Sequence, residues 1–109
     1  MIEKNFGRIT AIGAMPAIET TPGKLAYSIS KSNVVNLIQT IAEETKEFNI
    51  TANAVIPSII DTSANRQSMP NEDFSKWVKP EDIAETILFM FSDAAKAFRG
   101  NVIKMYGKM

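Results

Sequence analysis

The order of short β-rich runs and helical patterns constrains the fold of this chain more than any other feature. Three β-rich runs, at residues 7–12, 50–56 and 101–106, are separated by two helical patterns, at about residues 26–48 and from Pro80 onward. Strands that alternate with helices of this length form βαβ units, which give a parallel sheet with right-handed crossovers. The sequence therefore predicts an α/β fold in which both helices cover the same face of a three-stranded sheet.

Apolar spacing within the helical patterns indicates their buried faces. In the first helix the apolar residues recur three and four positions apart, at Val34, Leu37, Ile38 and Ile41. In the second helix we expect a buried stripe made by Ile83, Ile87, Leu88 and Phe91. Because parallel sheets are normally covered on both faces, a sheet with helices on one face predicts that a further part or a partner covers the rest.

Composition excludes several classes of function. The 109 residues suffice for one small domain, and 12 basic side chains cancel 12 acidic ones, so no net field favours nucleic acid or an acidic membrane. There is no cysteine and no histidine, which removes thiolate chemistry and the commonest general base and metal ligand. Asp61 and Asp73 lack spaced partners, so we expect no metal site. With no long apolar stretch and no signal peptide at the amino terminus, we expect a cytoplasmic protein that does not enter a membrane.

The polar segment from Ser58 to Lys79 is longer than an ordinary connection between a strand and a helix. We therefore expect it to act as a lid or a binding loop. Its apolar side chains Met69, Phe74 and Trp77 either line a substrate pocket or pack the lid onto the body of the domain.

Tyr27 and Lys31 are the candidate catalytic residues. They lie four positions apart near the start of the first helix, so both side chains share one helix face. A nearby ammonium favours the phenolate form of tyrosine and lowers its pKa, which makes the phenol a usable proton donor and acceptor. The spacing alone also fits an ordinary surface pair.

The residues around this pair form a recognisable series of blocks. They are Gly7-Arg8-Ile9, Pro22-Gly23-x-x-x-Tyr27-x-x-Ser30-Lys31, Asn53-x-Val55-x-Pro57-Ser58-x-Ile60-x-Thr62, Pro80-Glu81-Asp82-Ile83-Ala84, Ser92-Asp93 and Gly100-Asn101-Val102-Ile103. In this order, and over nearly the whole chain, they resemble the carboxyl-terminal half of the short-chain dehydrogenase/reductase family. The resemblance implies that residues 1–109 form the β-α-β-α-β half of a doubly wound, Rossmann-like parallel sheet.

The resemblance also implies a chemistry. Tyr27 would donate a proton during reduction of a carbonyl or imine, and Lys31 would favour the phenolate and hold the nicotinamide ribose. Pro57, Ile60 and Thr62 would complete the nicotinamide end of a site for NADH or NADPH. A small molecule would be the substrate, and the long helix, through Ile38 and Ile41, would support a homo-oligomer.

Several departures from the family pattern bear on function. The serine that usually polarises the substrate oxygen is replaced by Ala14, which has no hydrogen-bond donor in its side chain. Pro57-Ser58 stands where Pro-Gly is usual, and the glycine-rich phosphate-binding turn and the catalytic asparagine of the family have no counterpart in these residues. Ala14 and the stretch from Ser68 to Trp77 resemble dihydropteridine reductases, whose quinonoid pterin substrate is an activated imine. Ala14, Met69 and Trp77 are therefore the candidate substrate contacts.

Two functions follow from these observations. The first is an NAD(P)-dependent reductase segment that is inactive as an isolated 109-residue chain. The alternative is a truncated relative without catalytic activity that serves as an oligomerisation or interaction domain.

Overall fold

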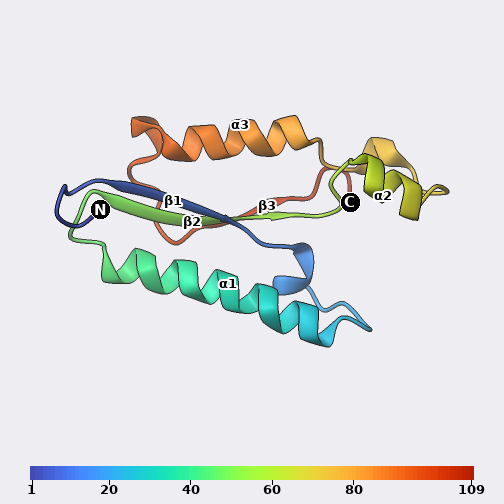
Figure 1. Ribbon diagram of the computed structural model, residues 1–109, viewed down its shortest axis with the longest axis horizontal. Coiled ribbons are helices and arrows are strands. Elements are labelled where there is room, and N and C mark those ends of the chain that lie inside the picture. The colour runs from blue at the N-terminus through green and yellow to red at the C-terminus, as the bar shows by residue number, and fades with distance from the viewer.

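The computed structural model describes residues 1–109 as a three-stranded parallel sheet with helices packed on it (Figure 1). Its main elements are β1 (Gly7–Ile12), α1 (Leu25–Glu44), β2 (Ile50–Pro57), α2 (Ser63–Ser68), α3 (Pro80–Phe91) and β3 (Val102–Met105). Short 3₁₀ turns lie at η1 (Met15–Ala17), η2 (Phe74–Lys76) and η3 (Asp93–Ala95). The predicted α/β class and the order of strands and helices are confirmed, and α2 is a helix within the lid segment that the sequence did not predict.

The central strand β2 organises the core. It pairs in parallel with β1, from Gly7 opposite Ile50 to Ile12 opposite Val55, and with β3, from Ala54 opposite Val102. All its residues are buried. Since side chains alternate along a strand, the small residues Ala52 and Ala54 face one helix and leave room for its close approach, while Val55 faces the other.

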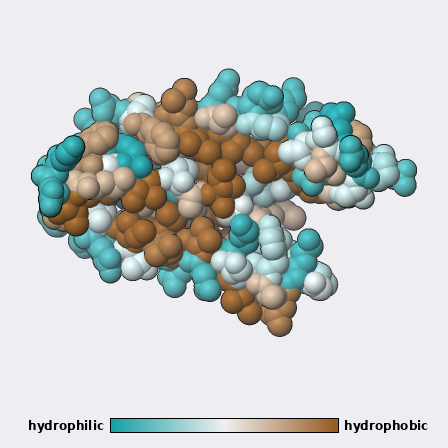
Figure 2. Space-filling model, in the orientation of Figure 1, coloured by the Kyte–Doolittle hydropathy of each residue, from teal (hydrophilic) through white to brown (hydrophobic).

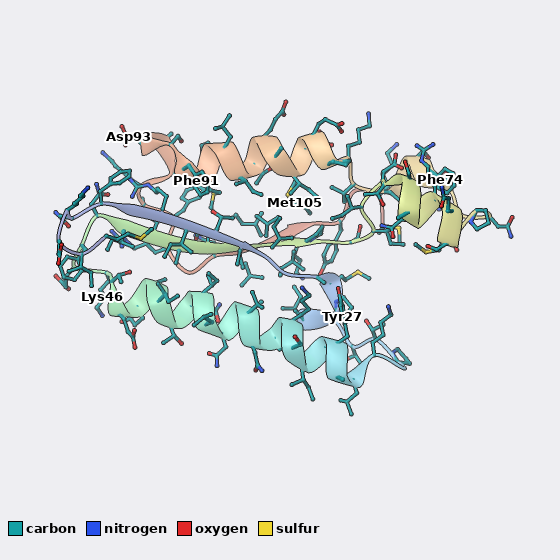
Figure 3. All side chains as sticks on the ribbon, viewed as in Figure 1. Tyr27, Lys46, Phe74, Phe91, Asp93 and Met105 are labelled. Carbon is teal, nitrogen blue, oxygen red and sulfur yellow. The ribbon has the colours of Figure 1, made fainter.

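The two long helices lie on opposite faces of the sheet, so the prediction that they share one face is wrong (Figure 1). Ile38 and Ala42 of α1 pack on Ala52 and Ala54, whereas α3 packs through Ile83 on Val55. In Figure 3, Met105 of β3 points to the α3 side. The strand order is β1-β2-β3, so both crossovers step across the sheet in the same direction. Two such crossovers on opposite faces have opposite hands, and one of them therefore departs from the right-handed rule.

The helices also bury different residues from those expected. Leu37, Leu88 and Phe91 are 58%, 71% and 46% exposed. Met90, at 1% exposed, replaces them in the α3 core because α3 contacts the sheet through Ile83, Ile87 and Met90, a spacing of four and three residues. Ile38 is 3% exposed and belongs to the core, so it is not available for a partner.

Both outer strands of the sheet, β1 and β3, have one unpaired edge. Figure 2 shows hydrophobic residues gathered between α1 and α3, where β1 runs along the sheet edge in Figure 1. Ile12 at the end of β1 is 48% exposed. None of the helices is long and apolar enough to span a bilayer.

The carboxyl-terminal tail fixes the lid segment to the end of the sheet. The Lys108 N–H donates to the Lys76 carbonyl over 3.0 Å. Gly107 has a φ of 62°, and a Cβ there would stand 2.6 Å from the same carbonyl. Both the conformation and the close approach require glycine at this position.

Candidate active site

A cleft of about 480 Å³ opens where β1 and β2 end, between the start of α1 and the lid. Figure 2 shows the surface hollowed between these two arms of the molecule. The cleft is lined by Gly13, Ala14, Met15, Pro16, Thr21, Lys24, Tyr27, Pro57, Ser58, Ile59, Ile60, Asn65 and Met69. The carboxyl ends of parallel strands are where open α/β sheets bind ligands.

Tyr27 lines this cleft from the first turn of α1, beside the loop after β1 (Figure 3). Its side chain is 47% exposed, and its hydroxyl has no hydrogen-bond partner within the chain. Lys31 does not line the cleft. Its Nζ lies 5.7 Å from the centre of the Tyr27 ring, so the helical spacing places the ammonium beside the ring.

The loop after β1 forms one wall of the cleft. The Gly13 N–H donates to the Val55 carbonyl over 2.8 Å, and a Cβ at Gly13 would stand 2.5 Å from Ile56 Cδ1. Glycine thus lets the chain leave β1 tightly against β2. Ser32 of α1 donates from Oγ to the Ala17 carbonyl over 2.8 Å, which holds η1 in place. Ala14 lines the cleft between these two hydrogen bonds, and its side chain contributes only a methyl group.

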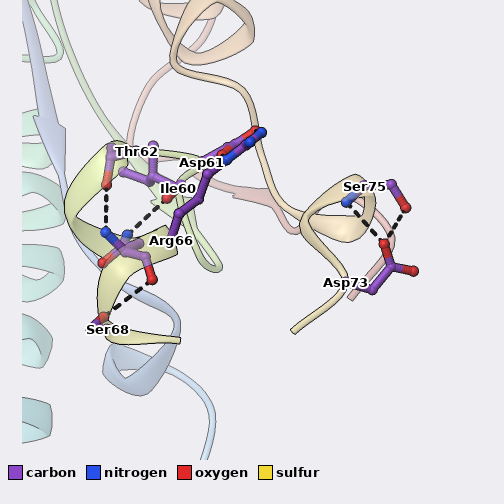
Figure 4. Close-up of polar contacts among 8 residues, drawn as sticks. Ile60, Asp61, Thr62, Arg66, Ser68, Asp73 and Ser75 are labelled. Atoms are coloured by element: carbon purple, nitrogen blue, oxygen red, sulfur yellow. Dashed lines mark hydrogen bonds and ion pairs between the residues drawn. The ribbon is translucent and has the colours of Figure 1, made fainter. Parts of the chain in front are cut away.

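The segment after β2 forms the opposite wall. Pro57 and Ile60 line the cleft, and the Ile60 carbonyl accepts a hydrogen bond from Asn65 Nδ2 at 2.8 Å (Figure 4). The Ile60 N–H makes no hydrogen bond within the chain. Thr62 lies just outside the lining residues, where its Oγ1 accepts from the Asn65 N–H at 3.2 Å and caps α2. The local role of Thr62 is therefore to start α2.

The lid brings only one of its candidate substrate contacts into the cleft. Met69 lines it, whereas Trp77 is 5% exposed and packs against Phe74 at a ring separation of 4.7 Å. Arg66 stacks over Phe74 and pairs with Asp61 through contacts of 2.6 and 2.9 Å (Figure 4). The hydrogen bond from Arg66 lowers the pKa of Asp61. The ion pair joins α2 to the segment before it, and the contact of Arg66 with Phe74 joins α2 to η2.

Lys24 is a cleft residue that the sequence analysis left without a role. It lies three residues before Tyr27, at the N-cap of α1, and its Nζ is 5.6 Å from the centre of the Tyr27 ring. Its place inside the Pro22-to-Lys31 block was visible in the sequence. The spacing did not indicate that Lys24, and not Lys31, would line the cleft.

Comparisons with known proteins agree with this architecture. The family model described as enoyl-(acyl carrier protein) reductase matches residues 1–107. The chain belongs to the short-chain dehydrogenase/reductase family. Among curated members, the 3-oxoacyl-[acyl-carrier-protein] reductase FabG of Thermotoga maritima is 31% identical over 98% of this chain and 47% of its own length. The acetoacetyl-CoA reductase of Synechocystis is 30% identical over 98% of this chain and 48% of its own length.

Solved structures of short-chain dehydrogenases/reductases share the Rossmann-like fold. One from Mycobacterium ulcerans superimposes with a TM-score of 0.90 at 26% identity, covering 99% of this chain and 43% of its own. A gluconate 5-dehydrogenase candidate from Beutenbergia cavernae, solved with NADP, superimposes with a TM-score of 0.87 at 26% identity, covering 98% of this chain and 47% of its own. This short-chain dehydrogenase/reductase chain thus spans about half the length of the relatives it matches.

Proposed function

We propose that these residues form the catalytic and substrate-binding half of an NAD(P)-dependent reductase that acts on a small carbonyl or imine. One observation carries the proposal. The cleft gathers Ala14, Tyr27, Pro57, Ile60 and Met69, which come from separate segments of the chain, at the carboxyl ends of β1 and β2. The family resemblance assigns these residues to the carboxyl-terminal half of the fold, and the coverage of the relatives is consistent with a half.

The residues present fit the nicotinamide end of such a site. The Ile60 N–H has no partner in the chain, so it is free to donate to a carboxamide oxygen at the cleft wall. The Tyr27 hydroxyl is equally free. NADH or NADPH, when bound, supplies the hydride. Tyr27 then donates its phenolic proton to the substrate oxygen or nitrogen, and the Lys31 ammonium stabilises the phenolate that remains.

Ala14 bears on the choice of substrate. A methyl group at this position cannot donate a hydrogen bond to a carbonyl oxygen, and the Thr21 hydroxyl already donates to the Glu19 carbonyl, so Tyr27 is the neutral side-chain donor that remains free on this side of the cleft. A substrate that is already activated, such as a quinonoid pterin or another conjugated imine, needs less polarisation. We therefore propose an activated imine or carbonyl, with a pterin-like compound as one candidate.

The test is a chimera of these residues with the part of the Thermotoga maritima reductase that lies outside the match. NADPH oxidation is followed with ethyl acetoacetate and with quinonoid dihydropterin as substrates. We expect Tyr27→Phe to lower kcat by about 10²- to 10⁴-fold, the usual contribution of a positioned proton donor. Tyr106→Phe is the matched control, because Tyr106 is the other of the two tyrosines and lies outside the cleft. Equal rates for Tyr27→Phe and the unmodified chimera would refute the catalytic role.

A second function is favoured by the exposed apolar residues. Leu25, Ile29 and Leu37 on α1 are 75%, 54% and 58% exposed, and β1 has an open edge. These features suit an interaction domain that pairs with another chain and performs no chemistry. A chimera that binds NADPH but shows no turnover with either substrate would favour this alternative.

A further inference from the structure

We propose that the cleft selects substrates that carry an anionic group, and that Lys24 binds this group while the reacting carbonyl or imine lies at Tyr27. The inference rests on the proposed reductase function and adds a substrate class to it. Lys24 would be a specificity-determining residue, separate from the Tyr27–Lys31 pair.

The charge of the cleft supports the first step. Lys24 is the only charged residue among those that line it, so the cleft carries one positive charge and no carboxylate. The whole chain, in contrast, has balanced charges. Lys24 takes part in none of the ion pairs of the chain, and the first turn of α1 has no acidic residue to neutralise it. Lys24 is exposed, so water solvates its ammonium in the open cleft, and a carboxylate or phosphate bound there would supply the counter-charge that the chain does not.

The hydrogen bonds of the other polar side chains support the second step. Ser58 Oγ donates to the Tyr106 carbonyl, Thr21 Oγ1 to the Glu19 carbonyl and Asn65 Nδ2 to the Ile60 carbonyl. These groups hold the walls of the cleft together. Among the side chains that line it, the Tyr27 hydroxyl and the Lys24 ammonium are the two donors with no partner in the chain. Two free donors in one cleft suit a ligand with two oxygen-bearing groups.

The positions of the two lysines separate their roles. Lys24 and Lys31 lie at nearly the same distance from the Tyr27 ring, 5.6 and 5.7 Å, but only Lys24 lines the cleft. A substrate in the cleft therefore has Lys24 and Tyr27 on its wall together. The 5.6 Å between Lys24 Nζ and the centre of the Tyr27 ring suits an anionic group a few bonds away from the reacting carbon.

The experiment uses the full 109-residue chain and two probes that differ in charge. Levulinate is a small ketone with a carboxylate, and methyl levulinate is its uncharged ester. Binding is followed by the amide chemical shifts of Ala14, Tyr27 and Ile60 at low ionic strength, where screening is weak. We expect levulinate to bind more tightly than the ester. Lys24→Gln should weaken levulinate about fivefold to tenfold, with little effect on the ester.

Two further variants control for charge and fold. Lys96→Gln removes one positive charge at an exposed position outside the cleft and should leave both probes unchanged. Lys24→Arg keeps the charge and should retain the preference for levulinate.

If both probes shift the cleft amides with equal affinity, the charge selection is overturned and the reductase assignment stands. If neither probe shifts them, the substrate site itself is placed wrongly and this proposal falls with it. Loss of turnover in the Tyr27→Phe chimera is measured independently of either result.

Discussion

At the scale of single residues, Asn53 shows how a motif residue acquires a structural role. It is 1% exposed, donates from Nδ2 to the Phe98 carbonyl over 2.9 Å, and accepts at Oδ1 from the N–H and the Nδ2 of Asn101. Asn53→Ala removes these bonds and leaves their partners unpaired. We expect it to lower the free energy of unfolding by roughly 2–3 kcal/mol, measured by urea denaturation. Asn36→Ala, at an exposed position of α1, should change it by less than about 0.5 kcal/mol.

Single residues also show how much of the candidate site the sequence could predict. The family-like block placed Asn53 in a strand, but nothing local to it indicates a turn 45 residues later. Tyr27 was identified by its spacing and the block around it, and it lines the cleft. Lys24 and Asn65 also line the cleft, yet their side chains reach it only because the loop after β1 and the start of α2 meet there. Contacts between distant segments depend on tertiary packing, which periodicity does not encode.

At the scale of elements, α1 has an outer apolar face that the spacing did not identify. Ile38 and Ile41, the residues predicted to support self-association, pack on the sheet, and the outer face carries Leu25, Ile29 and Leu37. We expect the chain to self-associate at about 50 μM, and Leu37→Lys to weaken that association because it places a charge in the apolar contact. Light scattering measures both. Gln39→Lys, an exposed change elsewhere on α1, is the control. A monomer at this concentration in the unmodified chain would rule out the interface.

The strands and helices themselves were predictable because each has a local signal. β1, β2 and the start of α3 lie where the β-rich runs and Pro80 indicated. The faces of the helices were not predictable in the same way. The right-handed rule would place both helices on one face. In the structure, Ala52 and Ala54 of β2 pack with α1 and Val55 packs with α3, which shows that the helices lie on opposite faces. In α3 the apolar residues nearly encircle the helix, so spacing alone did not show that Leu88 would be exposed and Met90 buried.

At the scale of the whole molecule, the three-stranded sheet is shorter than the matched relatives would lead one to expect of the complete fold. β2 is buried on both faces and paired on both edges, whereas β1 and β3 are each paired on one edge only. The curated relatives are about twice as long as the matched region. Of the two open edges, that of β1 lies where hydrophobic residues gather on the surface (Figure 2), so it is where we expect the rest of a family sheet to join, either within a longer polypeptide or from a partner.

This architecture leads to a prediction about cofactor binding by the 109 residues alone. Tight dinucleotide binding uses a glycine-rich turn whose N–H groups, together with a helix N-terminus, hold the pyrophosphate. The five glycines, at positions 7, 13, 23, 100 and 107, lie in no such turn. Under the proposed function, the chain contributes only the nicotinamide end of the site, chiefly through the free N–H of Ile60 and the side chains of Tyr27 and Lys31.

Those contacts must offset the cost of immobilising the whole cofactor, which amounts to several kcal/mol. We therefore expect NADH and NADPH to bind with dissociation constants of about 1 mM or weaker in calorimetric titrations of the chain, and no reductase activity. The chimera with the part of the Thermotoga maritima reductase that lies outside the match serves as the comparison and should bind NADPH much more tightly, because it is expected to restore the phosphate-binding turn. A low-micromolar constant for the chain alone would mean that its own residues hold the pyrophosphate, for example across an interface between two copies.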